Sequence, residues 1–232
     1  MGILRHPPPS VFSRGGTLLP STYAAARYVD AVIVSKACGD GGFQSDWSLS
    51  YSGLLCHRFG ADCSTVAVGG KCVMRECGGE QMPDYFPNTF YGERLAYNFS
   101  SWAPDAMVID LGTNDMRAIT KLGPTGMARF TNETVQFMKT ATTLYNKPDI
   151  EFFLTAGPME NASMPGTVAA VAQGIAAGMK VTFVNMTTAC YAARQHGNSD
   201  FCDGCAGHPG IEGHRGMYEA AWPVIGQVMG WN

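Results

Sequence analysis

The chain has few charged residues and no long apolar run. Asp, Glu, Lys and Arg make up 15% of its 232 residues, below the roughly 25% that is typical of soluble domains. The net charge is −3, and Lys and Arg form no run, so we expect neither a nucleic-acid partner nor electrostatic attachment to a membrane. No stretch reaches the roughly 18 apolar residues that a membrane-spanning helix requires.

The first residues also lack the pattern of a secretory signal peptide. Arg5 supplies positive charge, but prolines at 7–9 and glycines at 15–16 stand where an apolar helix should be. Residues 1–29 are rich in Pro, Gly, Ser and Arg without sustained periodicity, which is typical of loosely ordered chain. We therefore predict a poorly ordered segment over 1–29 and a single domain over 30–232.

Cysteines and glycosylation sequons favour the secretory pathway nonetheless. The eight cysteines are Cys38, Cys56, Cys63, Cys72, Cys77, Cys190, Cys202 and Cys205. Four Asn-X-Ser/Thr sequons occur, at Asn98, Asn132, Asn161 and Asn185. An even number of cysteines suits disulfides, and disulfides persist in oxidising compartments. We expect a secreted protein, and our hypothesis is that its natural N-terminus is missing or replaced here.

Short apolar segments alternate with segments of helical spacing along the domain. The predicted strands are 28–34, 64–68, 106–111, 151–155 and 181–185, and the predicted helices are 49–59, 127–145, 167–178 and 210–229. This alternation predicts a parallel sheet with helices on both faces. Ligands bind at the carboxyl ends of such strands, and three polar or glycine-rich segments follow them, at 69–71, 111–115 and 202–209.

Two of these segments carry a resemblance to a known family. GTND at 112–115, and His-Pro at 208–209 before the last helix, resemble the third and fifth motif blocks of SGNH (GDSL-like) hydrolases. The likeness extends to carbohydrate esterase family 2, whose members deacetylate polysaccharides. The matching segments are SLSYSGLL (48–55), VAVGGK (66–71), MPDYF (82–86), FSSWAPDAMVIDLGTND (99–115), GPM (157–159) and GCAGHPGIEGH (204–214). The resemblance implies a three-layer α/β/α, flavodoxin-like SGNH hydrolase fold with a five-stranded parallel sheet.

The same resemblance implies roles for three residues. His208 would be the general base that takes a proton from a serine and later protonates the leaving alcohol. The backbone N–H of Gly70 and the side-chain amide of Asn114 would donate hydrogen bonds to the oxyanion of the tetrahedral intermediate. Without the resemblance, the ordinary interpretation of Gly70 is a turn residue and that of His208 is a loop histidine. Asn114 and Asp115 would then cap the helix that follows them.

The nucleophile of the family is the weakest point of the match. SGNH hydrolases carry it in a Gly-Asp-Ser motif directly after the first strand, and this sequence has no such motif. Ser35 follows the predicted strand 28–34 and is the candidate nucleophile. Gly39-Asp40-Gly41 keeps the first two letters, but glycine cannot attack a carbonyl. The alternative is that an altered N-terminal segment has displaced the motif and leaves the chain inactive.

The acid partner of the histidine is irregular as well. Many SGNH proteins have Asp three residues before the histidine, where this chain has Cys205. Asp203, five residues before His208, is the candidate that would orient its ring, with a backbone carbonyl as the alternative. The Cys202-X-X-Cys205 pair could indicate redox chemistry or zinc, but its position and spacing favour structural disulfides. We predict no metal site and no cofactor.

The function that these expectations imply is ester hydrolysis. The substrate would be an acylated carbohydrate, with acetyl as the acyl group, or another small ester, and the route a serine acyl-enzyme. The alternative is an inactive or truncated protein of the SGNH fold that at most binds a glycan. The third hypothesis for the function is a redox or structural module built on the cysteines. The aromatic segment 85–102 is predicted to be mostly core or a surface that covers the strands, with a sugar-stacking platform as its alternative.

Overall fold

The computed structural model describes residues 2–4, 20–22, 47–67, 69–78, 81–88, 95–189 and 208–231. Its strands are β1 (Gly2–Leu4), β2 (Pro20–Thr22), β3 (Ser64–Thr65), β4 (Ala106–Asp110), β5 (Glu151–Ala156) and β6 (Lys180–Asn185). Its α-helices are α2 (Tyr51–Phe59), α3 (Met82–Tyr85), α4 (Met116–Leu122), α5 (Pro124–Tyr145), α6 (Met164–Ala176) and α8 (Ile211–Met229). Two short 3-10 helices, η1 (Trp47–Leu49) and η2 (Arg75–Cys77), complete the described elements.

The described strands form one sheet in the order β3-β1-β4-β5-β6, with β2 also paired to β4. β4, β5 and β6 run parallel to one another, and Val108 of β4 pairs with Phe153 of β5. β2 is parallel to β4, whereas β1 is antiparallel to both β3 and β4. The predicted strands 106–111, 151–155 and 181–185 are therefore confirmed, and so is the α/β class.

The prediction of five parallel strands needs correction. The segment 64–68 contributes a strand of two residues, and that strand pairs with β1 in the antiparallel direction. The segment 28–34 lies outside the described residues. β1 and β2 fall within 1–29, where no element was predicted, because a strand of three residues leaves no readable periodicity. The division of the chain at residue 30 stays a prediction.

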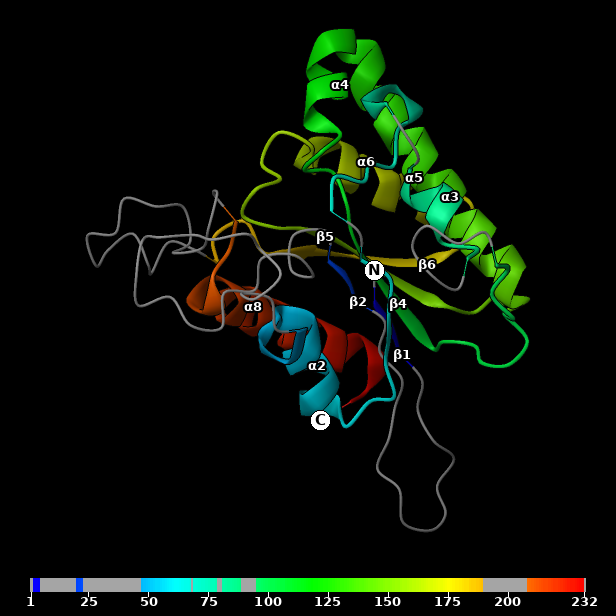
Figure 1. The fold of residues 1–232 in the computed structure, drawn as a ribbon, viewed down its shortest axis with the longest axis vertical. Coiled ribbons are helices and arrows are strands. Elements are labelled where there is room, and N and C mark those ends of the chain that lie inside the picture. The colour runs from blue at the N-terminus through cyan, green and yellow to red at the C-terminus, as the bar shows by residue number, and fades with distance from the viewer. Residues whose placement is uncertain are drawn as a thin grey trace.

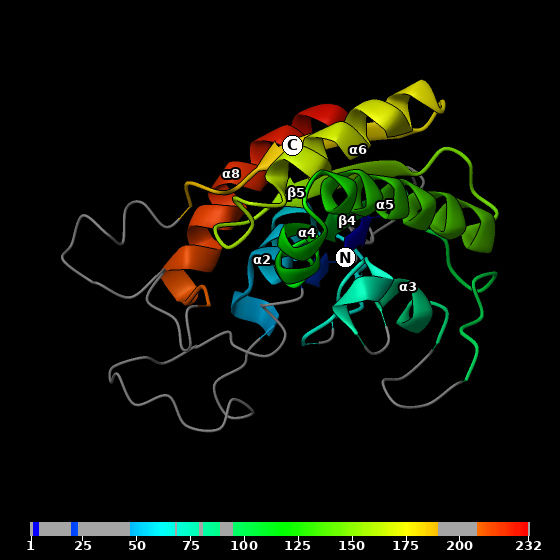
Figure 2. The same cartoon turned by 90° about the horizontal axis from the view of Figure 1, so that it is seen from above.

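Helices cover both faces of the sheet, as Figure 1 shows. α3, α4, α5 and α6 lie on one face, with α5 and α6 side by side (Figure 2). α2 and α8 pack together on the other face. Side chains of β4 alternate between the two layers, as expected of a strand. Met107 and Ile109 join the core under α5, and Ala106 and Val108 join the core under α2 and α8.

Aromatic side chains fill much of the core on the α5 face. Phe86 is 2% exposed, and its ring contacts Phe99, Phe137 and Tyr145 at centroid distances of 5.4–6.0 Å. Fully burying one such side chain stabilises a fold by roughly 1.5–3 kcal/mol. Phe86 thus belongs to the core, and Tyr85, Tyr97, Phe99 and Trp102 pack against it while partly buried. No helix in the described part of the chain is long and apolar enough to cross a bilayer.

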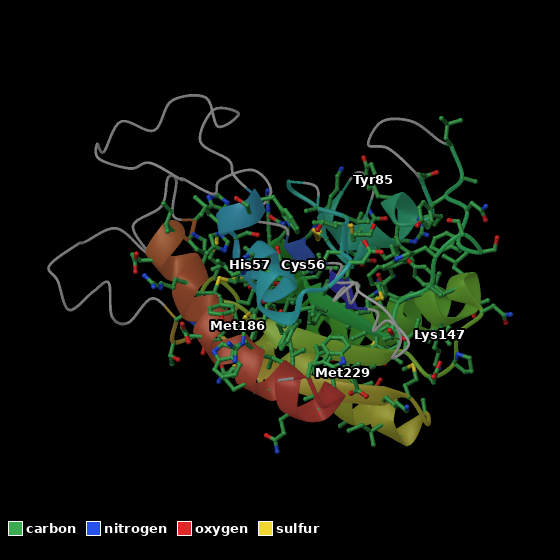
Figure 3. All side chains as sticks on the ribbon, turned by 90° about the horizontal axis from the view of Figure 1, so that it is seen from below. Cys56, His57, Tyr85, Lys147, Met186 and Met229 are labelled. Atoms are coloured by element: carbon green, nitrogen blue, oxygen red, sulfur yellow. A yellow bond between two sulfur atoms is a disulfide. The ribbon has the colours of Figure 1, made fainter. Side chains whose placement is uncertain are left out.

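α2 ends at Phe59, as the sequence predicts, and begins at Tyr51, two residues after the predicted start. The Ser50 side chain accepts a hydrogen bond from the Gly53 N–H at 3.1 Å, which caps the first turn. Gly60 ends the helix in the left-handed conformation that glycine tolerates. A disulfide from Cys56 to Cys63 then ties the last turn to the segment before β3. Cys56 is buried, while His57 beside it is exposed (Figure 3).

Candidate active site

A small pocket opens at the carboxyl ends of β4 and β5. It is lined by Asp110, Thr113, Gly157, Pro158, Met159, Glu160, Pro209 and Met217. Three parts of the chain contribute to it: the end of β4 with the segment after it, the segment after β5, and α8 with the segment before it. This is the edge of the sheet at which parallel α/β proteins bind ligands.

The structure brings the two predicted oxyanion donors to one place. The Asn114 side-chain amide donates a hydrogen bond to the backbone carbonyl of Lys71 at 3.0 Å. Gly70 directly precedes Lys71 and adopts φ +80°, which favours glycine. No described atom lies within 4 Å of the position that a Cβ at Gly70 would occupy. The backbone at Gly70 is thus open to approach, as an oxyanion donor must be.

The Asp115 side chain forms hydrogen bonds to the segment that follows Gly70. Its carboxylate accepts hydrogen bonds from the Val73 N–H at 3.1 Å and from the Met74 N–H at 2.7 Å. Although Asp115 stands at the N-cap of α4, its side chain does not cap that helix. Burial raises the pKa of Asp115 to about 6. The alternative role of a helix cap is therefore wrong for Asp115, which instead joins the start of α4 to the loop before η2.

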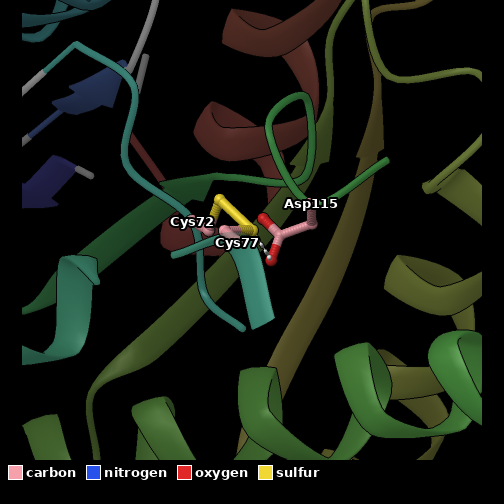
Figure 4. Close-up of side chains that lie close together, drawn as sticks. All are labelled: Cys72, Cys77 and Asp115. Atoms are coloured by element: carbon pink, nitrogen blue, oxygen red, sulfur yellow. Dashed lines mark hydrogen bonds between the residues drawn. A yellow bond between two sulfur atoms is a disulfide. The ribbon is translucent and has the colours of Figure 1, made fainter. Parts of the chain in front are cut away.

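A disulfide closes the same loop. Cys72 and Cys77 are bonded to each other, and the Cys77 sulfur lies 3.7 Å from Asp115 Oδ1 (Figure 4). The three side chains lie close enough together to suggest a metal site. Sulfur atoms that share a disulfide carry no thiolate, however, and thiolate is the form in which cysteine binds metal. The cluster is a structural clamp on the loop rather than a ligand set.

His208 lies two residues before the N-cap of α8, at Gly210. The side chain of His208 is half-buried. Its neighbour Pro209 lines the pocket, as does Thr113, the neighbour of Asn114. The candidate base and the candidate oxyanion donor thus each adjoin a wall of one pocket. Their predicted catalytic roles stay predictions, because the distance from either residue to a nucleophile is not described.

The other two predicted catalytic residues lie outside the described part of the chain. Ser35 falls in the gap 23–46 and Asp203 in the gap 190–207. Cys202 and Cys205 fall in the second gap as well. The assignments of nucleophile and acid partner therefore also stay predictions.

Sequence reasoning missed a pair of buried carboxyl groups in the pocket wall. Asp110, the last residue of β4, is 6% exposed, and Glu160 is 4% exposed. Asp110 accepts hydrogen bonds from the Thr155 hydroxyl at 2.7 Å and the Tyr51 hydroxyl at 3.0 Å. A carboxylate inside the apolar run AMVIDL was a signal that could have pointed to Asp110. Nothing in the sequence around Glu160 marks it.

The buried His214 of α8 contacts the start of another helix. Its Nδ1 accepts a hydrogen bond from the Tyr51 N–H at 3.4 Å, in the first turn of α2. The first four amides of a helix lack partners within the helix, so His214 supplies an acceptor for one of them. Burial lowers the pKa of His214 to about 4, which keeps the ring neutral.

Comparison with known proteins shows similarity to carbohydrate esterases. The chain is 25% identical over 197 residues to the cellulase/esterase CelE of Acetivibrio thermocellus, a match that covers 79% of the chain and 22% of CelE. A carbohydrate esterase family 2 enzyme from Corynascus, solved with its carbohydrate-binding domain, has a TM-score of 0.69 at 26% identity. That match covers 92% of this chain and 66% of the enzyme. The chain is similar in sequence and structure to carbohydrate esterase family 2.

A second family 2 structure extends the comparison. The family 2 carbohydrate esterase of Clostridium thermocellum, solved in complex with cellohexaose, has a TM-score of 0.73 at 18% identity, and the match covers 92% of this chain and 64% of that enzyme. At this identity the likeness shows the fold alone. The chain spans about a fifth of CelE and about two thirds of the family 2 structures. No family model matches the chain.

Proposed function

We propose that this protein is a carbohydrate ester hydrolase that removes acyl groups, most simply acetyl, through a serine acyl-enzyme. The observation that carries the proposal is the hydrogen bond between the Asn114 amide and the Lys71 carbonyl. It sets an amide side chain at the residue that follows the open backbone of Gly70, and Thr113, the neighbour of Asn114, lines the same pocket as Pro209. The similarity to family 2 esterases supports the same reading.

The Asn114 amide suits the role of an oxyanion donor. A primary amide carries two N–H groups. One of them binds the Lys71 carbonyl and fixes the orientation of the side chain. The second N–H is then the donor that would meet the oxyanion, together with the Gly70 N–H. Donors that are held in place before the reaction need no reorganisation as charge develops, which is why they lower the barrier.

The reaction would proceed in two halves. Ser35 attacks the ester carbonyl while His208 accepts the hydroxyl proton, and the tetrahedral oxyanion is bound by Gly70 and Asn114. The intermediate collapses to an acyl-serine as the bond between the carbonyl carbon and the sugar oxygen breaks. His208 gives its proton to that oxygen, and the sugar leaves with a free hydroxyl. Water then attacks the acyl-serine by the same route and releases the acid. Asp203 would orient the ring of His208. This chemistry requires no metal and no cofactor.

The competing proposal is a protein that keeps the fold but lacks a nucleophile and at most binds a glycan. The missing Gly-Asp-Ser motif favours it. The two proposals differ in one observable, because the first requires turnover of a small ester and the second forbids it.

Secretion is part of the proposal. Cys56–Cys63 and Cys72–Cys77 are disulfides, and disulfides are typical of oxidising compartments. The asparagines of all four sequons, Asn98, Asn132, Asn161 and Asn185, are exposed. Each is therefore accessible for glycosylation, as a secreted glycoprotein would require.

Hydrolysis of 4-nitrophenyl acetate tests the proposal. The purified chain is compared with the variants Ser35→Ala and His208→Ala, and acetate release from acetylated xylan is measured in parallel. We expect turnover in the unmodified chain and loss of turnover in both variants. Background rates in all three proteins would favour the inactive alternative. Turnover that survives Ser35→Ala but not His208→Ala would assign the nucleophile to another residue.

A further inference from the structure

Asp110 and Glu160 lie together in the pocket wall with neutral hydrogen-bond donors around them. Glu160 accepts hydrogen bonds from the Thr113 hydroxyl at 3.1 Å and the Gly157 N–H at 2.9 Å. The Asp110 carboxylate oxygens lie 3.7 and 3.8 Å from the position of a Cβ on Gly157. Both carboxyl groups thus border the same glycine. Among the described residues, neither of them forms an ion pair with Lys or Arg.

Two carboxylates in this setting cannot both carry a charge at neutral pH. Desolvation disfavours each charged form, and the two like charges repel one another in a medium of low dielectric. Every oxygen of the pair accepts from a hydroxyl or a backbone amide, and these neutral donors do not cancel a second negative charge. Burial, followed by the charge of Asp110 and a hydrogen bond to it, raises the pKa of Glu160 well above its ordinary value. One proton on the pair resolves the conflict.

The other titratable groups around the pair are neutral. Tyr51 of α2 donates to Asp110, and burial together with the charge of Asp110 raises its pKa well above 10. His214 of α8 stacks on Tyr51, and burial lowers its pKa to about 4. The shared proton therefore belongs to the carboxyl pair and not to its neighbours.

Glu160 also connects the pocket wall to the oxyanion segment. Its bond to Thr113 holds the residue next to Asn114. A second contact locks the same two loops together, because a Cβ at Gly112 would come within 2.5 Å of the Ser163 hydroxyl. Gly112 has φ +143°, and its close approach to Ser163 requires glycine. Thr113 is thus fixed on one side by packing and on the other by the Glu160 carboxyl.

We propose that Glu160, protonated and paired with Asp110, is a positioning residue that holds Thr113 and thereby keeps Asn114 aimed at the oxyanion. The proposal rests on the proposed esterase function for its catalytic consequence, but the shared proton does not depend on that function. When both carboxyls ionise at alkaline pH, their repulsion would push the loop of Glu160 away from Thr113.

The first test uses stability, so it applies whether or not the chain has esterase activity. A carboxyl whose pKa is raised in the folded state stabilises the fold below its unfolded pKa, and that stability is lost as pH rises through the folded pKa. We expect the denaturant midpoint of the unmodified chain to fall relative to that of Glu160→Gln as pH rises from 5 to 9. Glu219→Gln, at an exposed site on α8, is the control and should follow the unmodified chain. A constant difference between Glu160→Gln and the unmodified chain would overturn the shared proton.

The second test uses turnover of 4-nitrophenyl acetate. Glu160→Ala and Thr113→Val should lower kcat roughly 10- to 100-fold with little change in KM, because a misplaced donor weakens only transition-state binding. Glu160→Gln, the neutral isostere, should restore most of the kcat that Glu160→Ala loses. Circular dichroism establishes that each variant is folded. Full kcat in folded Glu160→Ala, or no rescue by Gln, would overturn the positioning role. An unmodified chain without turnover would refute the proposed function, and the stability test would then decide the shared proton.

Discussion

The Asn114 side-chain amide and the Lys71 carbonyl are 3.0 Å apart, although 43 residues separate them in the chain. This hydrogen bond joins the segment after β4 to the segment after β3. Asp115, the next residue, binds the same segment two residues further on, at Val73 and Met74. The two proposed oxyanion donors are therefore parts of one braced unit rather than of two independent loops.

Removal of the Asn114 amide should affect the transition state and leave ground-state binding nearly unchanged. We expect Asn114→Ala to lower kcat for 4-nitrophenyl acetate by roughly 10²–10³, as the loss of one oxyanion donor does elsewhere. Steady-state kinetics measure the effect. Asn132→Ala, at an exposed site on α5, is the matched control. A rise in KM with unchanged kcat would show that Asn114 binds substrate without serving the oxyanion.

Asp115 should stabilise the fold through its hydrogen bonds more than through its charge. Asp115→Ala leaves the Val73 and Met74 N–H groups buried without an acceptor, at a cost of about 1–3 kcal/mol for each. Asp115→Asn keeps one oxygen that both amides can reach, so its loss of stability should be much smaller. Urea unfolding of the two variants at pH 7 measures the difference. Equal losses would mean that the hydrogen bonds to the loop are not what Asp115 contributes.

The two described disulfides should differ in their effect on activity. Both close short loops, so removal of either should cost roughly 2 kcal/mol of stability. Replacement of Cys72 and Cys77 by alanine also frees the loop that carries Gly70, and we expect kcat to fall. Replacement of Cys56 and Cys63, at the far end of α2, should leave kcat close to that of the unmodified chain. Similar kcat in both double variants would contradict a role of the Cys72–Cys77 bond in bracing the site.

Protonation of His214 should lower the free energy of unfolding in acid. Its pKa is depressed to about 4 in the folded state, against about 6.5 when unfolded. Its stabilising contribution is complete above pH 6.5 and is lost as pH falls toward 4, a change of about 3 kcal/mol. His214→Asn keeps an acceptor for the Tyr51 N–H but does not titrate. The unfolding free energy of the unmodified chain should therefore fall more steeply between pH 6.5 and 4 than that of His214→Asn.

Much of the fold could be predicted from the sequence, because long elements leave long patterns. The apolar run of β4 and the periodicity of α5 predicted both elements to within a few residues. β1 and β2 could not be predicted, since neither is longer than three residues. Their pairing with β4 depends on contacts far apart in sequence, which no local pattern records.

The sequence motifs predicted Gly70 and Asn114 as the two oxyanion donors, and this role stays a prediction. The structure shows that the Asn114 amide binds the carbonyl of Lys71, the residue after Gly70. The pairing of Asp110 with Glu160 could not be predicted, because it depends on two loops meeting at the end of the sheet. The contact between His214 and Tyr51 could not be predicted for the same reason. Tyr51 is 163 residues away and adjoins His214 only in the folded chain.

Covalent labelling of the nucleophile tests the central claim most directly. The chain is incubated with a fluorophosphonate, whose fluoride an activated serine displaces to form a stable phosphonyl-serine, and the adduct is located by intact mass and peptide mapping. We predict one adduct per chain, at Ser35, that forms slowly or not at all in His208→Ala. No adduct on the folded chain, or an adduct whose formation is independent of His208, would contradict a serine esterase built on this site.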